Sequence, residues 1–215
     1  MLKPSPARLN WTMETEPVSY PDAISHMQLR VAAIRAGLEP EQIWLLEHPA
    51  CYTAGTSANE NDLTDPDLFP VFETGRGGQY TYHGPGQRIA YAMLDLQKRG
   101  IDIREYVCML ERWIIATLKQ FDINGECRDG RIGVWVSYDG REDKIAALGV
   151  RVSRGVAYHG ISINNNPNLD HFRGIVPCGI KEYGVTSLTQ LGRNVSMAEL
   201  DRALQQQFYP IFGAE

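Results

Sequence analysis

Two residues of this sequence have the chemistry of a nucleophile and a partner that handles its proton. Cys178 stands between Pro177 and Gly179, so its backbone is stiff on one side and can be approached closely on the other. Lys144 directly precedes the apolar run 145–150, which places its amine at the mouth of an expected buried strand. An ammonium near a thiol favours the attacking thiolate, and a desolvated lysine can act as a base. We therefore predict that Cys178 and Lys144 act together in one pocket.

Both residues also have an ordinary structural interpretation. Most single cysteines are small core residues, and most lysines are solvated surface charges. The polar, glycine-flanked context of Cys178 favours the chemical interpretation, and the other cysteines lack such a context. We expect purely structural roles for these three: Cys51, Cys108 and Cys127.

A glycine-rich polar segment, residues 76–87, has the composition of a loop that wraps a ligand. Its adjacent glycines leave backbone N–H groups able to face a carbonyl oxygen or a phosphate, and Arg76 could hold an anion. The segment matches neither a Walker A sequence nor a dinucleotide-binding fingerprint, so a tight turn with a solvated arginine is an equally good interpretation. His83 and His159 each precede a glycine, and we expect them to support the site rather than to catalyse.

The composition is that of an ordinary globular chain. At 215 residues it suits one domain, so we expect residues 1–215 to form a single catalytic domain. A net charge of −5 without a lysine-rich run disfavours a nucleic-acid binder, and the four cysteines form no pattern with zinc-ligand spacing, so we expect no metal. No apolar window suits a signal peptide or a membrane span. We expect a cytoplasmic protein with reduced thiols and no membrane partner.

Hydrophobic periodicity predicts the elements that must position these residues. Helices are expected from Pro21 to Gly37, after a capping box at Asp102 and Glu105, and from Ser196 to about Pro210, with a short helix near 167–172. Strands are expected at 8–14, 43–47, 71–74, 88–96, 132–136, 145–152 and 156–163. Because strands often follow one another directly, we predict an α+β (mixed α/β) fold with helices packed on a mixed, largely antiparallel sheet.

Taken together, the motifs resemble the lipoyl(octanoyl) transferase family, the octanoyl-[acyl-carrier-protein]:protein N-octanoyltransferases. The resemblance covers separated motifs between about residues 43 and 188. They lie at 46–49, 75–87, 94–96, 133–136, 144–153, 158–160 and 174–188, the last with Val-Pro-Cys-Gly-Ile at 176–180. Two positions depart from the family pattern: Ala92, where proline is frequent, and Ser162, where alanine is common. Ser162 could narrow or hydrate an acyl pocket.

This resemblance implies the fold of the biotin and lipoate protein ligases, with Cys178 as acyl acceptor and Lys144 lowering the pKa of its thiol. It implies transfer of an octanoyl group from octanoyl-acyl carrier protein to a lysine of a lipoyl domain, through a thioester on Cys178, as the first step of protein lipoylation. It also assigns contacts with the acyl substrate to Arg76, Gly77, Gly78, Gln79, Tyr80, Thr81, Tyr82 and His83, to Ala147, Leu148 and Gly149, and to Gly160, Ile161 and Ser162.

The implied partners are octanoyl-acyl carrier protein, the lipoyl domains of 2-oxoacid dehydrogenase complexes and the glycine cleavage H protein. The carrier brings its own phosphopantetheine, so no separate cofactor is expected, and we expect a monomer. Carrier proteins are generally acidic, which predicts a basic rim around the site, with Arg76, Arg151, Arg154, Arg173 and Lys181 as candidates. Two alternatives stay open: an ATP-dependent lipoate or biotin protein ligase, and a binding module without turnover.

Overall fold

A large mixed sheet forms the middle layer of the protein. The computed structural model describes residues 9–176 and 183–213. The sheet is eight-stranded with the order β1-β2-β6-β10-β9-β8-β7, and β11 pairs with β9. β1 runs parallel to β2 and β11 parallel to β9, whereas the other neighbours are antiparallel, so the predicted sheet type is confirmed. The strands are β1 (Leu9–Met13), β2 (Glu41–Leu46), β6 (Gln87–Met93), β7 (Glu126–Arg128), β8 (Arg131–Tyr138), β9 (Arg141–Ser153), β10 (Val156–Asn164) and β11 (Gly184–Val185).

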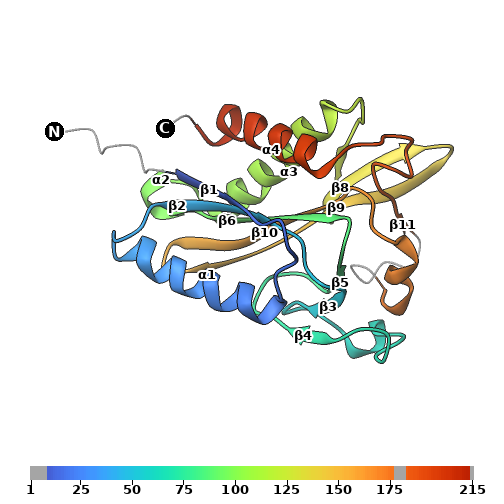
Figure 1. Cartoon of the computed structure of the whole chain (residues 1–215), viewed down its shortest axis with the longest axis horizontal. Helices are drawn as coiled ribbons and strands as arrows, with labels where there is room; N and C mark the ends of the chain where they lie inside the picture. The colour runs from blue at the N-terminus through green and yellow to red at the C-terminus, as the bar shows by residue number, and fades with distance from the viewer. Residues whose placement is uncertain (1–8, 177–182, 214–215) are drawn as a thin grey trace.

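Helices cover both faces of this sheet (Figure 1). α1 (Tyr20–Arg35) lies on one face, and α3 (Ile103–Lys119) and α4 (Met197–Phe212) lie on the other. Strand β2 shows why both coverings are needed, because its alternate residues enter different cores. Ile43 and Leu45 join the cluster under α3 and α4, whereas Trp44 and Leu46 join the cluster under α1. None of the described helices is long and apolar enough to cross a membrane.

The helix starts follow the predicted capping residues. Pro21 occupies the first turn of α1, and the Asp102 side chain accepts hydrogen bonds from the Arg104 and Glu105 N–H groups at the start of α3. Ser196 and Glu199 form a complete capping box at α4. Such caps contribute about 1 kcal/mol each, because they satisfy N–H groups that have no partner inside the helix.

Several predicted boundaries differ from the structure by a few residues, the largest difference being β9, which begins at Arg141 instead of 145. Two other differences have a clear physical cause. The strand expected at 88–96 ends at Met93, because Asp95 caps a short helix, α2 (Leu96–Arg99), by accepting from the Lys98 N–H. The last helix does not end near Pro210 but continues to Phe212. Pro210 is exposed, so water can reach the carbonyl that its ring leaves without an N–H donor, and Phe212 stacks on Phe208 in the core with ring centres 4.5 Å apart.

A smaller three-stranded sheet carries the predicted ligand loop. It has the order β4-β3-β5 and consists of β3 (Cys51–Ala54), β4 (Val71–Glu73) and β5 (Tyr80–His83). Its core contains Tyr52, Tyr82 and Phe172, the last from the 3-10 helix Leu169–Gly174. Another 3-10 turn spans Glu60–Asp62. The small sheet therefore holds residues 76–83 against the end of the large sheet.

The three cysteines expected to be structural are free thiols in different settings. Cys51 is buried in β3, and burial raises the pKa of its thiol to about 12. Cys108 and Cys127 are exposed. Although the Cys127 side chain is exposed, partial desolvation of its sulfur, followed by the nearby Glu111 carboxylate, raises the pKa of the thiol to about 11. Thiols with pKa values this high are poor nucleophiles at neutral pH, in keeping with the structural roles expected of Cys51 and Cys127.

Candidate active site

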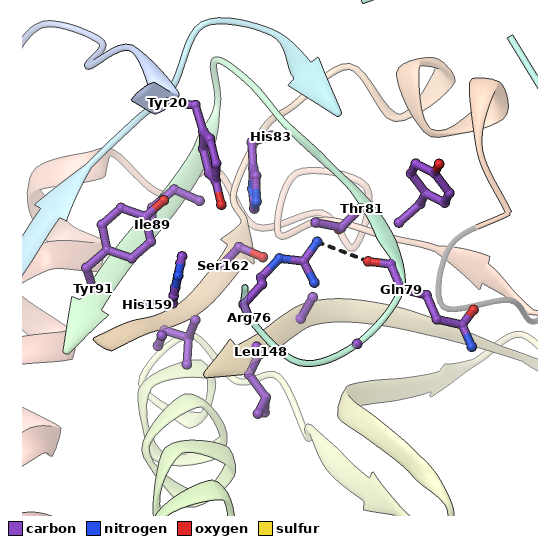
Figure 2. Close-up of a pocket in the computed structure, with 16 residues that line it drawn as sticks. Tyr20, Arg76, Gln79, Thr81, His83, Ile89, Tyr91, Leu148, His159 and Ser162 are labelled. Atoms are coloured by element: carbon purple, nitrogen blue, oxygen red, sulfur yellow. Dashed lines mark hydrogen bonds between the residues drawn. The ribbon is translucent and has the colours of Figure 1, made fainter. Parts of the chain in front are cut away.

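A cavity of about 60 Å³ lies between the large sheet and residues 76–83 (Figure 2). It brings together most of the residues expected to contact an acyl substrate: Arg76, Gly78, Gln79, Tyr80, Thr81, His83, Ala147, Leu148, Gly149, Gly160, Ile161 and Ser162. Two expected residues are not among its lining. The Gly77 N–H donates to Val150 O at 3.0 Å, and the Tyr82 hydroxyl hydrogen-bonds His171 Nδ1 at 2.8 Å. These two residues hold the loop and the small sheet in place.

Glycines on β9 and β10 make the floor of the cavity thin. A Cβ on Gly160 would stand 2.1 Å from the Ala90 carbonyl oxygen, so the neighbouring strand leaves no room for a side chain there. A Cβ on Gly149 would stand 3.0 Å from Gly77 O and from the Arg76 side chain. The loop can approach the sheet closely because this position has no side chain.

Arg76 fastens the loop to the small sheet. Its Nη2 donates to Thr53 O at 2.9 Å, to Thr53 Oγ1 at 2.7 Å and to Gln79 O at 3.0 Å, and its Nη1 donates to Gly77 O at 2.9 Å. The planar guanidinium serves several carbonyl oxygens at once, which a lysine ammonium could not do in this geometry. With 7% of its surface exposed, Arg76 is wrongly predicted as part of a basic rim.

The other rim candidates divide between the surface and the part of the chain that is not described. Arg151, Arg154 and Arg173 are exposed, as a docking rim requires. Lys181 lies outside the described residues.

One end of the cavity is built from neutral polar rings, anchored from behind by His48. The His48 Nδ1–H donates to Val18 O at 2.6 Å, so its Nε2 accepts from the Tyr91 hydroxyl, also at 2.6 Å. Burial lowers the pKa of His48 to about 4, so the ring stays neutral at physiological pH. Tyr91 is likewise buried, and this raises the pKa of its hydroxyl well above the ordinary value.

His83 and His159 are also held neutral. Gln87 uses its amide nitrogen to donate to Tyr82 O and Asn164 Oδ1, so its oxygen accepts from the His83 Nδ1–H at 2.7 Å. Burial, and then the neighbouring His48, hold the pKa of His83 well below its usual value. Burial, followed by the Arg76 and Arg151 cations, lowers the pKa of His159 to about 3.

The backbone at His159 is in the left-handed region, with φ at +61°. Successive strand residues normally point to opposite faces, yet the Tyr158 and His159 rings stack on each other with centres 4.9 Å apart. The unusual φ costs a residue other than glycine about 1–2 kcal/mol. The fold thus accepts backbone strain where it places an imidazole in the wall of the cavity.

Lys144 lies beside a second, smaller cavity that adjoins the first. The lysine is 5% exposed; its Nζ donates to Ile132 O at 2.9 Å and lies 4.7 Å from the centre of the Trp135 ring. A carbonyl oxygen and an indole face are both suitable partners for an ammonium. The cavity holds about 10 Å³, and it shares three lining residues with the larger one: Thr81, Ala147 and Ser162.

Cys178 lies outside the described residues, so its pairing with Lys144 stays a prediction. The described chain on both sides of that segment contacts the surroundings of Lys144. Phe172, before it, and Val185, after it, both line the smaller cavity. Val185 pairs directly with Lys144 between β11 and β9, and the Thr186 N–H donates to Lys144 O at 2.9 Å.

The chain is similar in sequence to a known protein family and to several octanoyltransferases. The lipoyl protein ligase A/B catalytic domain family matches residues 19–209. The chain belongs to this family. An octanoyltransferase from Paramagnetospirillum magneticum is 60% identical over 208 residues, covering 96% of this chain and 98% of that protein. Another from Parvibaculum lavamentivorans is 58% identical over 207 residues, covering 94% and 92%. The predicted family and acyltransferase class are confirmed.

The fold of this family member is confirmed by a solved structure. The bipartite lipoate protein ligase from Thermoplasma acidophilum matches with a TM-score of 0.68 and covers 93% of this chain and 82% of its own. Its sequence is 16% identical, so the likeness shows the lipoate protein ligase fold and nothing about the reaction of this chain.

Sequence reasoning missed the residues that complete the cavity in this family member. Tyr20, Ile89 and Tyr91 line it, and His159, noted only as a supporting residue, forms part of its wall. Tyr20 starts α1 and Ile89 and Tyr91 lie on β6, so no local motif links them to the loop. The one available signal was His159, a residue type enriched at positive φ, directly before a glycine.

Proposed function

We propose that this protein transfers an octanoyl group from a carrier-protein thioester to a lysine of a lipoyl domain through a thioester on Cys178. The observation that carries the proposal is the cavity, whose apolar walls include Ile89, Leu148 and Ile161, next to the smaller cavity that Lys144 lines. Burying an octanoyl tail there at ~0.8 kcal/mol per CH2 is worth roughly 5 kcal/mol. The octanoyltransferase relatives support the identity of the acyl group.

In the first step, the Cys178 thiolate attacks the carbonyl carbon of the octanoyl thioester. A new carbon–sulfur bond forms, the bond to the phosphopantetheine sulfur breaks, and that sulfur leaves and takes up a proton. Lys144 is the proposed carrier of the proton, from the Cys178 thiol to the departing thiolate. One thioester replaces another, so the step is nearly balanced in energy and needs no nucleotide.

In the second step, the neutral amine of the target lysine attacks the same carbonyl carbon. The bond to Cys178 sulfur breaks, an amide forms, and the amine proton passes through Lys144 to solvent or back to the thiolate. The backbone N–H of Gly78, which lines the cavity at φ +89°, is a candidate donor to the tetrahedral oxyanion. The donor must be fixed before the reaction, and Arg76 fixes this loop.

The proposed partners are octanoyl-acyl carrier protein, the lipoyl domains of 2-oxoacid dehydrogenase complexes and the glycine cleavage H protein, with the enzyme acting as a monomer. Arg151, Arg154 and Arg173 are the exposed cations available to an acidic carrier. Reversing their charges should slow association, most strongly at low salt, because screening weakens with falling ionic strength.

A transfer assay without nucleotide tests the proposal. Octanoyl-carrier protein and a lipoyl domain are mixed with the enzyme with and without ATP, and the mass of the lipoyl domain is followed. We expect an octanoyl amide at equal rates in both mixtures, and none with Cys178→Ser. Product that requires ATP and free acid, with full activity in Cys178→Ala, would instead establish a ligase. Binding of octanoate without any product would establish a binding module.

A further inference from the structure

We propose that one end of the cavity sets the length of the acyl chain by presenting polar groups that hydrocarbon cannot satisfy. This end is the ring cluster, which consists of Tyr20, His83, Tyr91 and His159. The inference rests on the proposed acyl transfer and adds to it the residues at which the acyl chain must end. We call this limit on chain length at the ring cluster the stop.

The ring cluster lies where the far end of an acyl chain would reach. Figure 2 shows its rings gathered on one side of the cavity and Gln79 on the opposite side, with Ser162 between them. The cavity beside Lys144 shares Thr81, Ala147 and Ser162 with the main cavity but none of the ring cluster. From Ser162 to His159, β10 runs about 10 Å at ~3.3 Å per residue. That span is comparable with an extended octanoyl chain, so a chain that reacts near Lys144 ends at the cluster.

Three members of the ring cluster keep polar atoms for which the described residues provide no hydrogen bond. The Tyr20 hydroxyl is buried and has no partner of normal geometry there, and its polar neighbours are Thr74 and Arg76. His83 Nδ1 donates to Gln87, which leaves Nε2 as an acceptor. The contacts recorded for the His159 ring within the described chain are with the rings of Tyr91 and Tyr158, not with a hydrogen-bonding group. In contrast, the Tyr91 hydroxyl already donates a hydrogen bond to His48 Nε2.

A longer chain would place hydrocarbon against these polar atoms and leave them without a hydrogen bond. Covering an unsatisfied polar group with hydrocarbon is unfavourable, whereas the Ile89, Leu148 and Ile161 walls nearer Ser162 favour each added CH2. Each added methylene therefore favours binding up to the ring cluster and disfavours binding beyond it. A fitted pocket discriminates one methylene by roughly 10-fold or more, so two extra carbons should be rejected clearly.

The strained backbone of His159 is a second, independent observation in favour of the stop. With ordinary strand alternation, its ring would leave the side on which Tyr158 lies; the positive φ keeps it in the cavity wall. Strain of this kind persists where the surrounding fold enforces it, and it gathers at ligand sites. Glycine would adopt the same φ without strain and would remove the imidazole.

Acylation rates with chains of different length test the stop. Hexanoyl, octanoyl and decanoyl thioesters of carrier protein are mixed with wild type, Tyr20→Phe and His159→Gly, and intact mass follows the adduct. We expect the wild-type decanoyl rate to be below about one tenth of the octanoyl rate, and each variant to raise that ratio about fivefold or more. Tyr158→Phe is the matched control, because this ring is buried beside His159 but does not line the cavity; its ratio should match wild type.

A decanoyl-to-octanoyl ratio unchanged in both variants, or raised equally in Tyr158→Phe, would overturn the stop. Calorimetric binding of free octanoate and decanoate to the same proteins gives a readout that needs no reaction. If no thioester ever acylates the protein but the variants still gain affinity for decanoate, the proposed transfer fails and the stop stands. If acylation proceeds and neither readout changes with Tyr20 or His159, the transfer stands and the stop fails.

Discussion

The two ends of the proposed acyl site surround their polar groups in opposite ways. At one end, Lys144 lies against the Ile132 carbonyl oxygen and the Trp135 ring, both good partners for a cation. At the other end, burial keeps His48, His83 and His159 uncharged, and their rings form hydrogen bonds only as neutral groups or not at all. In the proposed reaction, the first end exchanges a proton with the substrate, and the second end limits the length of the acyl chain.

The proposed reaction and the proposed selection of chain length thus use opposite ends of one pocket. Lys144, the proposed proton carrier, lies on β9 next to β11, and the neutral rings come from α1, β5, β6 and β10. Because the two groups share only the cavity between them, substitutions at one end should affect the reaction and substitutions at the other should affect stability and selection. Each of the following variants separates the two ends.

The largest effect is expected at the reactive end. Lys144→Met keeps the aliphatic stem and removes the amine, so transfer should fall about 100-fold or more in kcat/KM, as for loss of a general acid–base group. Lys98→Met is the control, because Lys98 lies on α2 with a largely exposed side chain. Stopped-flow transfer rates, with circular dichroism as a check on folding, measure the difference. Activity of Lys144→Met within about threefold of wild type would remove Lys144 from the mechanism.

Between the two ends, Arg76 should matter first for stability. Arg76→Met leaves the carbonyl oxygens of Thr53, Gly77 and Gln79 without these donors, at a cost of about 3 kcal/mol in the free energy of unfolding. Arg173→Met, which breaks only an exposed pair with Asp170, should cost less than about 1 kcal/mol. Urea unfolding followed by fluorescence compares the two. Equal losses would show that the Arg76 hydrogen bonds do not hold the loop.

Acid should lower the free energy of unfolding by charging the histidines that are buried at the neutral end. The unfolded chain protonates its histidines near pH 6.5, whereas the folded chain protonates His48 near 4 and His159 near 3. Stability is therefore complete above about pH 6.5 and is lost as pH falls toward 4, by about 2 kcal/mol or more between pH 7 and 5. His159→Asn tolerates the positive φ and removes one titrating ring, so it should flatten this loss. Chemical denaturation at both pH values measures it; an identical slope in the variant would contradict burial as the cause.

The smallest effect is expected from one hydroxyl. Tyr91→Phe leaves buried His48 Nε2 without its donor, which should cost about 1–2 kcal/mol in the free energy of unfolding. Tyr158→Phe removes a hydroxyl for which no hydrogen bond within the described chain is recorded, and it should cost less than about 0.5 kcal/mol. Thermal unfolding of the two variants side by side decides the point. A Tyr91→Phe protein as stable as Tyr158→Phe would mean that the His48 contact contributes nothing.

The sequence predicts the elements well where the signal is local. Capping residues such as Ser196 indicate where a helix begins, and the glycines of residues 76–87 indicate a loop independently of its tertiary surroundings. Two of the wrong boundaries have tertiary causes. α4 runs through Pro210 because Phe212 gains a core contact, and β6 stops early because Asp95 caps α2.

The site is predictable only where its residues are contiguous. Residues 76–83 and 147–149 lie together in the sequence, so one motif reveals several of them. Tyr20 and Tyr91 reach the cavity from separate elements, and only the fold brings them next to His83. The buried position of Arg76 could not be predicted from the sequence either, because its hydrogen bonds to Thr53 depend on how the small sheet folds.

Intact mass spectrometry after mixing the enzyme with octanoyl-carrier protein, without a lipoyl domain, tests the central chemistry most directly. We expect one octanoyl adduct that peptide mapping places on Cys178, formed rapidly in wild type, slowly in Lys144→Ala and not at all in Cys178→Ser. Wild-type protein that transfers the group to a lipoyl domain yet never carries an adduct, or a serine variant that carries the same adduct, would contradict a thioester on Cys178.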